Sequence, residues 1–312
     1  MNLDLLVVVF YFLVIGAVGW MGIRRANSKE AYLVAGRNLG PGLYLGTLSA
    51  VVLGGASTIG SVKLGYTYGI SGVWLCGALG LGIVVLSLVL AKPLLKLKLY
   101  TVSQVLSRRY HPAARVTSGA IMLAYDLMVA VTSIIAIGSV MQVMFGLSFS
   151  ASILLGGGLV AAAALAALMS TASACLLASS TIALEDVLPA IRRKPSGGLA
   201  AGRFTTLLMG AVMLGLAFVV RDVLAALTLA YNLLVGGMLI PLVGAIFWPR
   251  ATSAGAIASM LTGSLCVVGL MVWHGIDANS PIYGGLLGGG VAFVLGSLLS
   301  RPAAQLQTQT ER

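Results

Sequence analysis

The sequence predicts an all-α protein that crosses a membrane about nine times. Hydrophobic residues make up 59% of its 312 positions and charged residues only 9%, which excludes an ordinary soluble domain. Apolar stretches long enough to span a bilayer as helices follow one another, with only short polar loops between them. We therefore expect a polytopic helix bundle that forms a single transmembrane domain over residues 1–300, followed by a polar tail at 301–312.

Hydropathy sets the expected crossings. The first is interpreted as a retained span, because Asp4 stands where a signal peptide would have a basic region and Arg24–Arg25 follow the apolar run. The predicted spans are Leu5–Ile23, Leu43–Ile70, Gly72–Leu95, Val116–Met144, Phe149–Leu184, Thr205–Val220, Val223–Phe247, Ala254–Trp273 and Ile282–Ser300.

The basic residues predict the orientation. With nine crossings, all of the 19 Lys and Arg residues except Lys63 and Arg221 fall on one side of the membrane. Short loops rich in Lys and Arg are cytoplasmic, so the N-terminus is expected outside and the C-terminus inside. Basic cytoplasmic loops also explain the net charge of +11. The sequence has no basic stretch interleaved with aromatic residues that would indicate nucleic-acid binding.

The fifth predicted span, Phe149–Leu184, is too long for one simple crossing. A helix of that length would measure about 54 Å, against a hydrocarbon core of about 30 Å. Gly156–Gly158 is the natural place for a break. We expect Phe149–Leu155 to be a short outer or interfacial segment and Val160–Leu184 to be the true span.

Small and hydroxyl residues share one helical face within this stretch. Their spacing is i, i+3, i+4 and i+7, and they are Ala167, Ser170, Thr171 and Ala174. Such a face serves close helix packing in many membrane proteins. It also suits a hard cation, which prefers oxygen ligands. The spacing alone leaves both interpretations open.

The second predicted span contains three glycines between Leu53 and Gly60, which indicate either a helix break that frees carbonyl groups or a close-packed glycine face. Two ionisable residues, Lys63 and Asp126, fall within apolar stretches. Such residues are costly in a bilayer, so they indicate a substrate or ion path, or else a structural ion pair or a residue that faces an aqueous cavity. No catalytic or phosphate-binding motif is present, and the three cysteines have no metal-ligand spacing, so we expect neither an enzyme nor a cofactor.

Several motifs together resemble the sodium/solute symporter family, which includes sodium-coupled glucose, proline and pantothenate transporters. The most specific is Ala167–Ser173 with Leu176–Ser180 and Glu185–Asp186. The others are Tyr32–Gly40, Gly54–Gly60, Thr101–Ser103, Ser107–Tyr110, Phe247–Thr252 and Ala254–Gly255.

The resemblance implies a LeuT-like core of two inverted five-helix repeats in the cell inner membrane. It implies a Na⁺ site in which Na⁺ is the coupling ion and the cargo is a small organic solute. The implied ligands are the carbonyls of Ala56, Ile59 and Ala167 and the hydroxyls of Ser170 and Thr171. Where the family often has a carboxylate near this site, the chain has Thr58 and Lys63, which with Asp126 are possible path residues.

The chain departs from the family by an apparent internal deletion. Residues 1–160 resemble the N-terminal helices, with Leu154–Val160 similar to the start of the fourth core helix, whereas Ala161 onward resembles the eighth. We therefore expect a sodium-coupled transporter impaired by the missing helices, with an incomplete core and a tendency to form homo-oligomers in the lipid bilayer. The alternative is a non-transporting membrane fragment or an accessory subunit that packs on another membrane protein.

Overall fold

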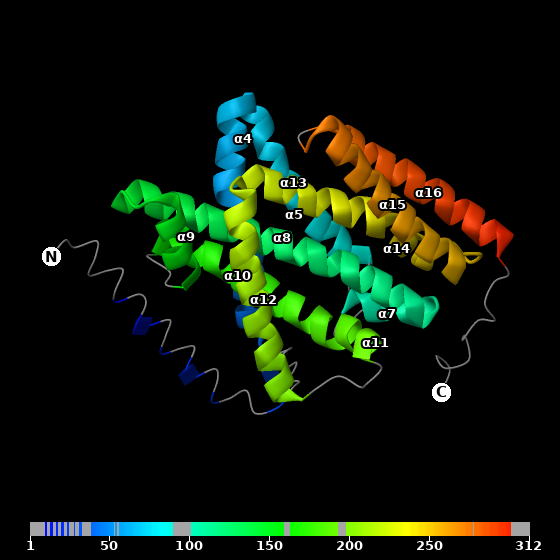
Figure 1. Ribbon diagram of the computed structural model, residues 1–312, viewed down its shortest axis with the longest axis horizontal. Coiled ribbons are helices and arrows are strands. Elements are labelled where there is room, and N and C mark those ends of the chain that lie inside the picture. Colours follow the sequence, from blue (N-terminus) through cyan, green and yellow to red (C-terminus); the bar gives the residue numbers. More distant parts are fainter. Residues whose placement is uncertain are drawn as a thin grey trace. The chain divides into compact units, whose positions relative to one another are not determined.

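The computed structural model describes residues 39–52, 54, 56–89, 101–158, 163–192, 198–276 and 278–300, and isolated positions between Phe10 and Tyr32 (Figure 1). The apparent join at Val160–Ala161, the tail 301–312 and most of the predicted span Leu5–Ile23 lie outside these residues. Within the described part the chain is helical and contains no strand, which confirms the predicted all-α class.

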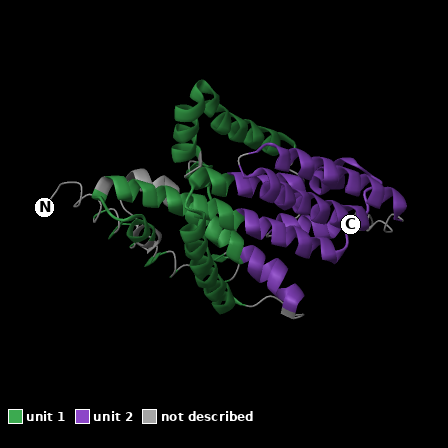
Figure 2. Cartoon of the chain, turned by 45° about the horizontal axis from the view of Figure 1, so that its top comes forward, with its two compact units in different colours: residues 1–93, 126–180, 197–227 green, residues 94–125, 181–196, 228–312 purple. Residues whose placement is uncertain are grey.

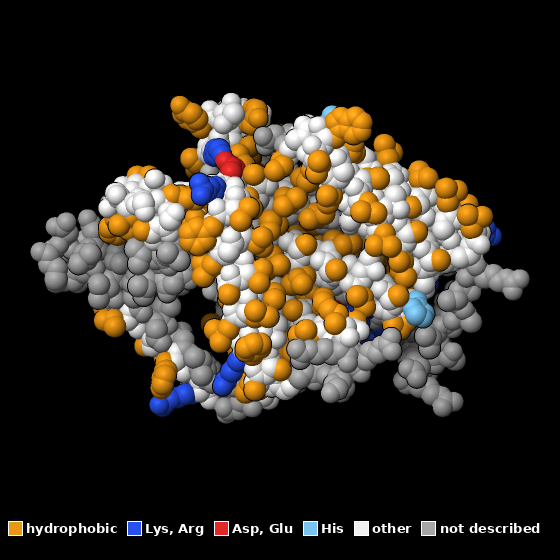
Figure 3. Space-filling model, in the orientation of Figure 1, with side chains coloured by type: hydrophobic (Ala, Val, Ile, Leu, Met, Phe, Trp, Pro, Cys, Tyr) orange, Lys and Arg blue, Asp and Glu red, His pale blue; other side chains and the backbone are white. Residues whose placement is uncertain are grey.

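Seven described stretches are long and apolar enough to cross a membrane, so the protein is a multi-pass membrane protein. Hydrophobic side chains predominate on the face shown in Figure 3, as expected for a surface in contact with lipid. The seven stretches are Ser57–Val89, Pro112–Val143, Thr171–Ile191, Leu199–Val220, Val223–Phe247, Ser253–His274 and Ser280–Leu299.

The first of these stretches contains a sharp turn. The π-helix η2 (Ala56–Gly60) continues into α4 (Ser61–Tyr68), and the short 3-10 helix η3 (Gly69–Gly72) leads into α5 (Val73–Val89). Gly69 has a φ of 65°, which favours glycine, and a Cβ on Gly72 would overlap the backbone of Gly65. The chain therefore reverses direction here, at the top of Figure 1, where the sequence placed the boundary between two spans.

The chain divides into two compact units that are interleaved in the sequence (Figure 2). Unit 1 contains residues 1–93, 126–180 and 197–227, and unit 2 contains residues 94–125, 181–196 and 228–312. The long helix α8 (Pro112–Phe145) contributes its first part to unit 2 and the remainder to unit 1. Neither unit corresponds to the N-terminal or C-terminal half of the chain.

Unit 1 contains α3 (Pro41–Val52), the α4–α5 turn, the end of α8, α9 (Phe149–Gly158), most of α10 (Ala163–Ile182) and α12 (Leu199–Val220). The chain turns between α8 and α9 at Gly146, whose φ is 63°. These two helices then approach so closely that a Cβ on Gly138 would lie 2.9 Å from Cγ1 of Ile153. The helix α9 also packs against α12.

Unit 2 contains α7 (Val102–Arg109), the π-helix η4 (Ala183–Val187), α11 (Leu188–Arg192), the end of α13 (Val223–Leu234), the π-helix η5 (Val235–Leu239), α14 (Ile240–Phe247), α15 (Ser253–His274) and α16 (Ser280–Leu299). Side-chain hydroxyls cap two of these helices: Thr101 accepts a hydrogen bond from the amide of Gln104, and Thr252 accepts one from that of Gly255.

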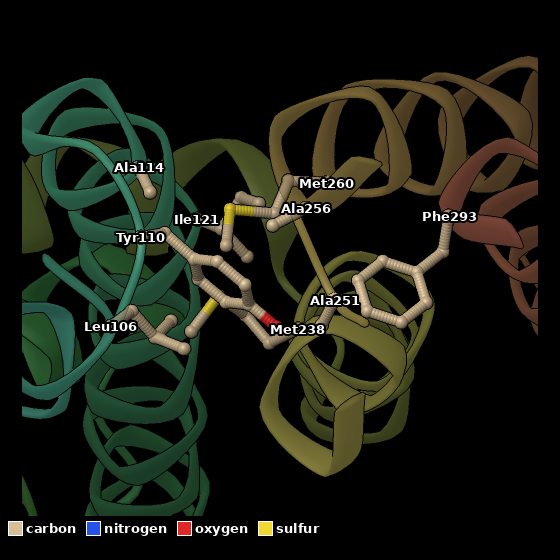
Figure 4. Packing of buried hydrophobic residues seen from close by; sticks show 9 residues of the cluster. All are labelled: Leu106, Tyr110, Ala114, Ile121, Met238, Ala251, Ala256, Met260 and Phe293. Carbon is tan, nitrogen blue, oxygen red and sulfur yellow. The ribbon is translucent and has the colours of Figure 1, made fainter. Parts of the chain in front are cut away.

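Two packing features hold unit 2 together. The helices η5, α15 and α16 meet at a glycine junction, formed by Gly236, Gly263 and Gly285, where added Cβ atoms would meet the neighbouring backbones. A hydrophobic cluster then joins this junction to α7 and α8 (Figure 4). Its Tyr110 hydroxyl donates a hydrogen bond of 3.0 Å to the carbonyl of Pro241.

Candidate functional site

The candidate site lies in unit 1, where α10 meets the end of α3. The hydroxyl of Thr171 donates a hydrogen bond of 2.7 Å to the carbonyl oxygen of Val51, and the carbonyl oxygen of Ala50 lies 3.4 Å away. Thr171 is buried, with 6% of its surface exposed. Carbonyls in the last turn of a helix lack partners within that helix, so a hydroxyl from another helix stabilises the break.

Gly54 makes this approach possible. A Cβ on Gly54 would lie 2.6 Å from Cβ of Thr171 and would also overlap its hydroxyl oxygen, so no larger residue fits without a shift. The chain bends at Gly54, between the end of α3 at Val52 and the start of η2 at Ala56. The structure thus confirms the predicted irregularity in the second span and shows that a glycine also permits close packing there.

The hydroxyls that follow the bend also bind carbonyls at the break. Ser57 donates a hydrogen bond of 2.6 Å to the carbonyl of Val52, and Thr58 donates one of 2.7 Å to that of Gly54. Several carbonyl and hydroxyl oxygens therefore lie close together at the break, where the apolar helix α3 ends. Such oxygens are the donors that a hard cation prefers, because they can replace its hydration shell.

The other predicted sodium ligands lie on the same two segments. Ala56 and Ile59 belong to η2, and Ala167 and Ser170 belong to α10. The side chains of Ala167 and Ser170 lie outside the described part of the structure. The convergence of all five oxygens on one cation stays a prediction.

Asp126, a predicted path residue, lies on α8 with 8% of its surface exposed. Its Oδ2 atom has no hydrogen-bond partner among the described residues. A carboxyl oxygen without a partner in a membrane span costs free energy, so an ionisable residue kept there indicates a functional site. The burial of Asp126 and its unpaired oxygen therefore agree with a role in a substrate or ion path, which stays a prediction.

Lys63, the other charged path residue, forms an ion pair. Its Nζ lies 2.7 Å from Oδ2 of Asp222, and roughly half of each side chain is exposed. Asp222 also accepts a hydrogen bond from the amide of Ala225 at the start of α13. Desolvation raises the pKa of Asp222, but the hydrogen bonds from Lys63 and from the backbone outweigh it and hold the pKa below its usual value.

The sequence pattern missed this pairing, since it placed Asp222 beside Arg221 only as a neighbour in the chain. In the structure the Nε of Arg221 donates a hydrogen bond of 3.1 Å to the carbonyl of Phe218. Arg221 has a φ of 52°, the left-handed conformation that ends α12.

A second polar cluster, in unit 2, was also missed. The Nε of Arg115 donates a hydrogen bond of 2.7 Å to Oδ1 of Asp186, and the hydroxyl of Thr101 donates one of 2.8 Å to Oδ2. Arg115 also donates to the carbonyl of Glu185. The side chain of Asp186 is fully buried. The available signal was an acidic pair at the end of an apolar run, which requires a cationic partner.

One of three comparisons with known proteins gives a match, and it is to a family model. The model of the sodium:solute symporter family matches residues 32–162 and 157–263, which together cover well over half of the chain. The two matched segments overlap at residues 157–162, a range that contains the apparent join at Val160–Ala161. Comparisons with curated proteins and with solved structures each found no match.

Proposed function

Because the chain belongs to the sodium:solute symporter family, we propose that it is a sodium-coupled transporter of a small organic solute, impaired by missing core helices. The family and the seven apolar helical stretches support a multi-pass membrane protein of transporter type. The proposal adds the coupling ion Na⁺, the cell inner membrane and the impairment.

The observation that carries the sodium site is the contact between Thr171 and the end of α3. It brings a hydroxyl of α10 to 2.7 Å from the carbonyl oxygen of Val51, beside the helix break. Transporters with broken helices bind their coupling ions at such breaks, because unwound backbone there offers carbonyl oxygens. A small rotation of the Thr171 hydroxyl would turn its lone pairs toward a cation.

The two matched segments support the impairment. A complete inverted-repeat transporter moves one helical bundle against another around a site between them. If the family's central helices are absent at residues 157–162, the helix break at Gly54 lacks the second repeat's broken helix as its opposite wall. Such a chain would bind sodium without completing a coupled cycle.

The test is transport by the purified full chain in liposomes with an inward sodium gradient. Labelled proline, glucose, pantothenate and short carboxylates would be offered, with an ionophore that collapses the gradient as the control. We expect no sodium-driven accumulation. Concentrative uptake of any of these solutes, abolished by the ionophore, would show that the chain is not impaired.

The competing function is that of an accessory subunit or a non-transporting fragment. It is favoured by the exposed surface of the α4–α5 region, where Tyr66, Ile70 and Trp74 are 94%, 89% and 75% exposed. Sodium-dependent stabilisation of the purified chain distinguishes the two functions. The transporter proposal requires such stabilisation, whereas the accessory role does not.

A further inference from the structure

An apolar groove of about 560 Å³ lies on unit 2 between α14 and α16. Its walls come from the end of η5 and from both helices, and none of the lining residues is charged. Its lining includes Val243, Phe247, Trp248, Gly290, Phe293 and Val294. Gly290 leaves it open, because a Cβ added there would meet no atom within 4 Å.

Aromatic side chains line one end of the groove, and basic residues follow them in the chain. Trp248 ends α14 and packs edge-on against Phe293, with ring centroids 5.3 Å apart. The chain then turns at Pro249–Arg250. The Nη2 of Arg109 donates a hydrogen bond of 3.1 Å to the carbonyl of Pro249, which holds a second guanidinium at this turn. The side chain of Arg250 is exposed.

The protein presents an apolar groove, then an aromatic ring, then guanidinium groups. A phospholipid presents an acyl chain, then the interfacial region, then a charged headgroup. Tryptophan is enriched at the boundary between hydrocarbon and headgroups. Basic side chains on the cytoplasmic side attract anionic headgroups, and a guanidinium matches the geometry of a phosphate oxygen pair. A soluble anion would leave the apolar groove unused, and a lipid without net charge would offer no anionic headgroup to the two guanidinium groups.

We propose that the groove binds one acyl chain of an anionic phospholipid whose phosphate lies against Arg250 and Arg109. The acyl chain would lie along Val243, Phe247 and Val294, with Gly290 beneath it. Nothing in this site involves the sodium ligands, so the proposal stands independently of the transport activity.

Tryptophan fluorescence provides the test. Trp248 lines the groove, whereas Trp20, Trp74 and Trp273 are 61%, 75% and 85% exposed and can be changed to Phe. The resulting full chain would be placed in nanodiscs that contain a small fraction of phosphatidylglycerol or phosphatidylcholine with brominated acyl chains. We expect stronger quenching of Trp248 by phosphatidylglycerol. Equal quenching by the two lipids at the same mole fraction would overturn the proposal.

Two pairs of variants separate the headgroup from the acyl chain. Arg250→Gln is expected to reduce the preference for phosphatidylglycerol by about fivefold, the contribution of one basic residue near an anionic surface. Arg203→Gln, which removes an exposed charge from α12, should leave the preference unchanged. The same preference in both variants would contradict the headgroup contact.

Gly290→Leu would place a side chain in the groove and is expected to reduce quenching by both lipids. Its control is Gly269→Leu on α15, where an added Cβ also meets nothing within 4 Å. Native mass spectrometry of the same variants gives a second measurement, the number of phosphatidylglycerol molecules retained. Unchanged quenching and retention in Gly290→Leu would exclude the groove as the site.

Discussion

The ammonium group of Lys63 on α4 lies 2.7 Å from the carboxylate of Asp222 at the start of α13, so an ion pair joins two segments that are 159 residues apart in the chain. Asp222 uses its other oxygen to accept a hydrogen bond from the amide of Ala225. One carboxylate thus stabilises both a helix start and a contact between helices. The pairing also gives Lys63 a structural role, next to the path role that the sequence suggested.

The ion pair predicts a change of stability with pH. The pKa of Asp222 is lower in the folded than in the unfolded chain, so its contribution is complete above the unfolded pKa, near 4, and is lost as the pH falls through the folded pKa. Because both side chains are about half exposed, solvent screening limits the contribution to about 1 kcal/mol or less. Unfolding in mixed micelles would measure it. Wild-type protein and Asp222→Asn should differ at neutral pH and converge under acid; a constant difference would contradict this origin.

The buried cluster in unit 2 predicts a larger effect. Arg115→Ala should destabilise the protein by about 3–5 kcal/mol, because it leaves the fully buried Asp186 carboxylate without its cation. Arg108→Ala, at an exposed position on α7, is the control and should change stability by about 0.5 kcal/mol or less. The double variant Arg115→Ala, Asp186→Ala should recover part of the loss. No recovery would show that the arginine acts through packing alone.

We predict that stability requires glycine at position 54, because Thr171 leaves no room for a side chain there. Gly54→Ala should cost about 1–3 kcal/mol, since the new methyl group overlaps the Thr171 side chain. Gly46→Ala on α3 offers a matched control with nothing within 4 Å, and helix propensity should make it neutral or stabilising by up to about 1 kcal/mol. Thermal unfolding of the two variants checks the difference. Equal behaviour would mean that α10 does not pack against the break.

The sodium site predicts a ligand-dependent shift in stability. Sodium should raise the melting temperature of the purified chain relative to the same ionic strength of choline, because binding to the folded state alone stabilises it. The double variant Ser170→Ala, Thr171→Ala should abolish this shift, whereas Thr171→Ser retains the hydroxyl and should preserve it. A shift that survives the double variant would place the ion elsewhere.

The orientation predicts the result of reporter fusions. A reporter that is active only in the periplasm should be silent when fused after Arg312, because all but two of the Lys and Arg residues then lie inside. The same reporter inserted in the loop between α15 and α16 should be active and serves as the control. An active fusion after Arg312 would overturn the nine-crossing arrangement.

Local sequence predicted those features that depend on local composition. The predicted span Val223–Phe247 coincides with an observed one, and three glycines predicted the break after α3. The predicted start of α12, Thr205, was too late. The helix begins at Leu199, but Arg203 lowers the hydropathy of its first turns. A hydropathy pattern reports contact with lipid, whereas helix ends also depend on hydrogen bonds.

Long-range pairings could not be predicted in the same way. Nothing near Asp186 indicates that its partner is Arg115, and nothing near Lys63 indicates Asp222, since each pairing depends on how distant helices pack. At the candidate site the sequence placed Thr171 on a polar helical face. It did not predict that this hydroxyl would contact Val51, because the bend at Gly54 determines which carbonyl is presented.

The glycine junction of η5, α15 and α16 has a consequence for biosynthesis. All of its contacts are made within residues 236–289, so they form between neighbours in the chain and carry a low loop-closure cost. The helices α15 and α16 can pack as a hairpin on the single preceding helix that contains η5 as soon as all three are inserted. Loss of helices far upstream does not remove their partners. These three helices would therefore pack together during membrane insertion even where helices earlier in the chain are missing.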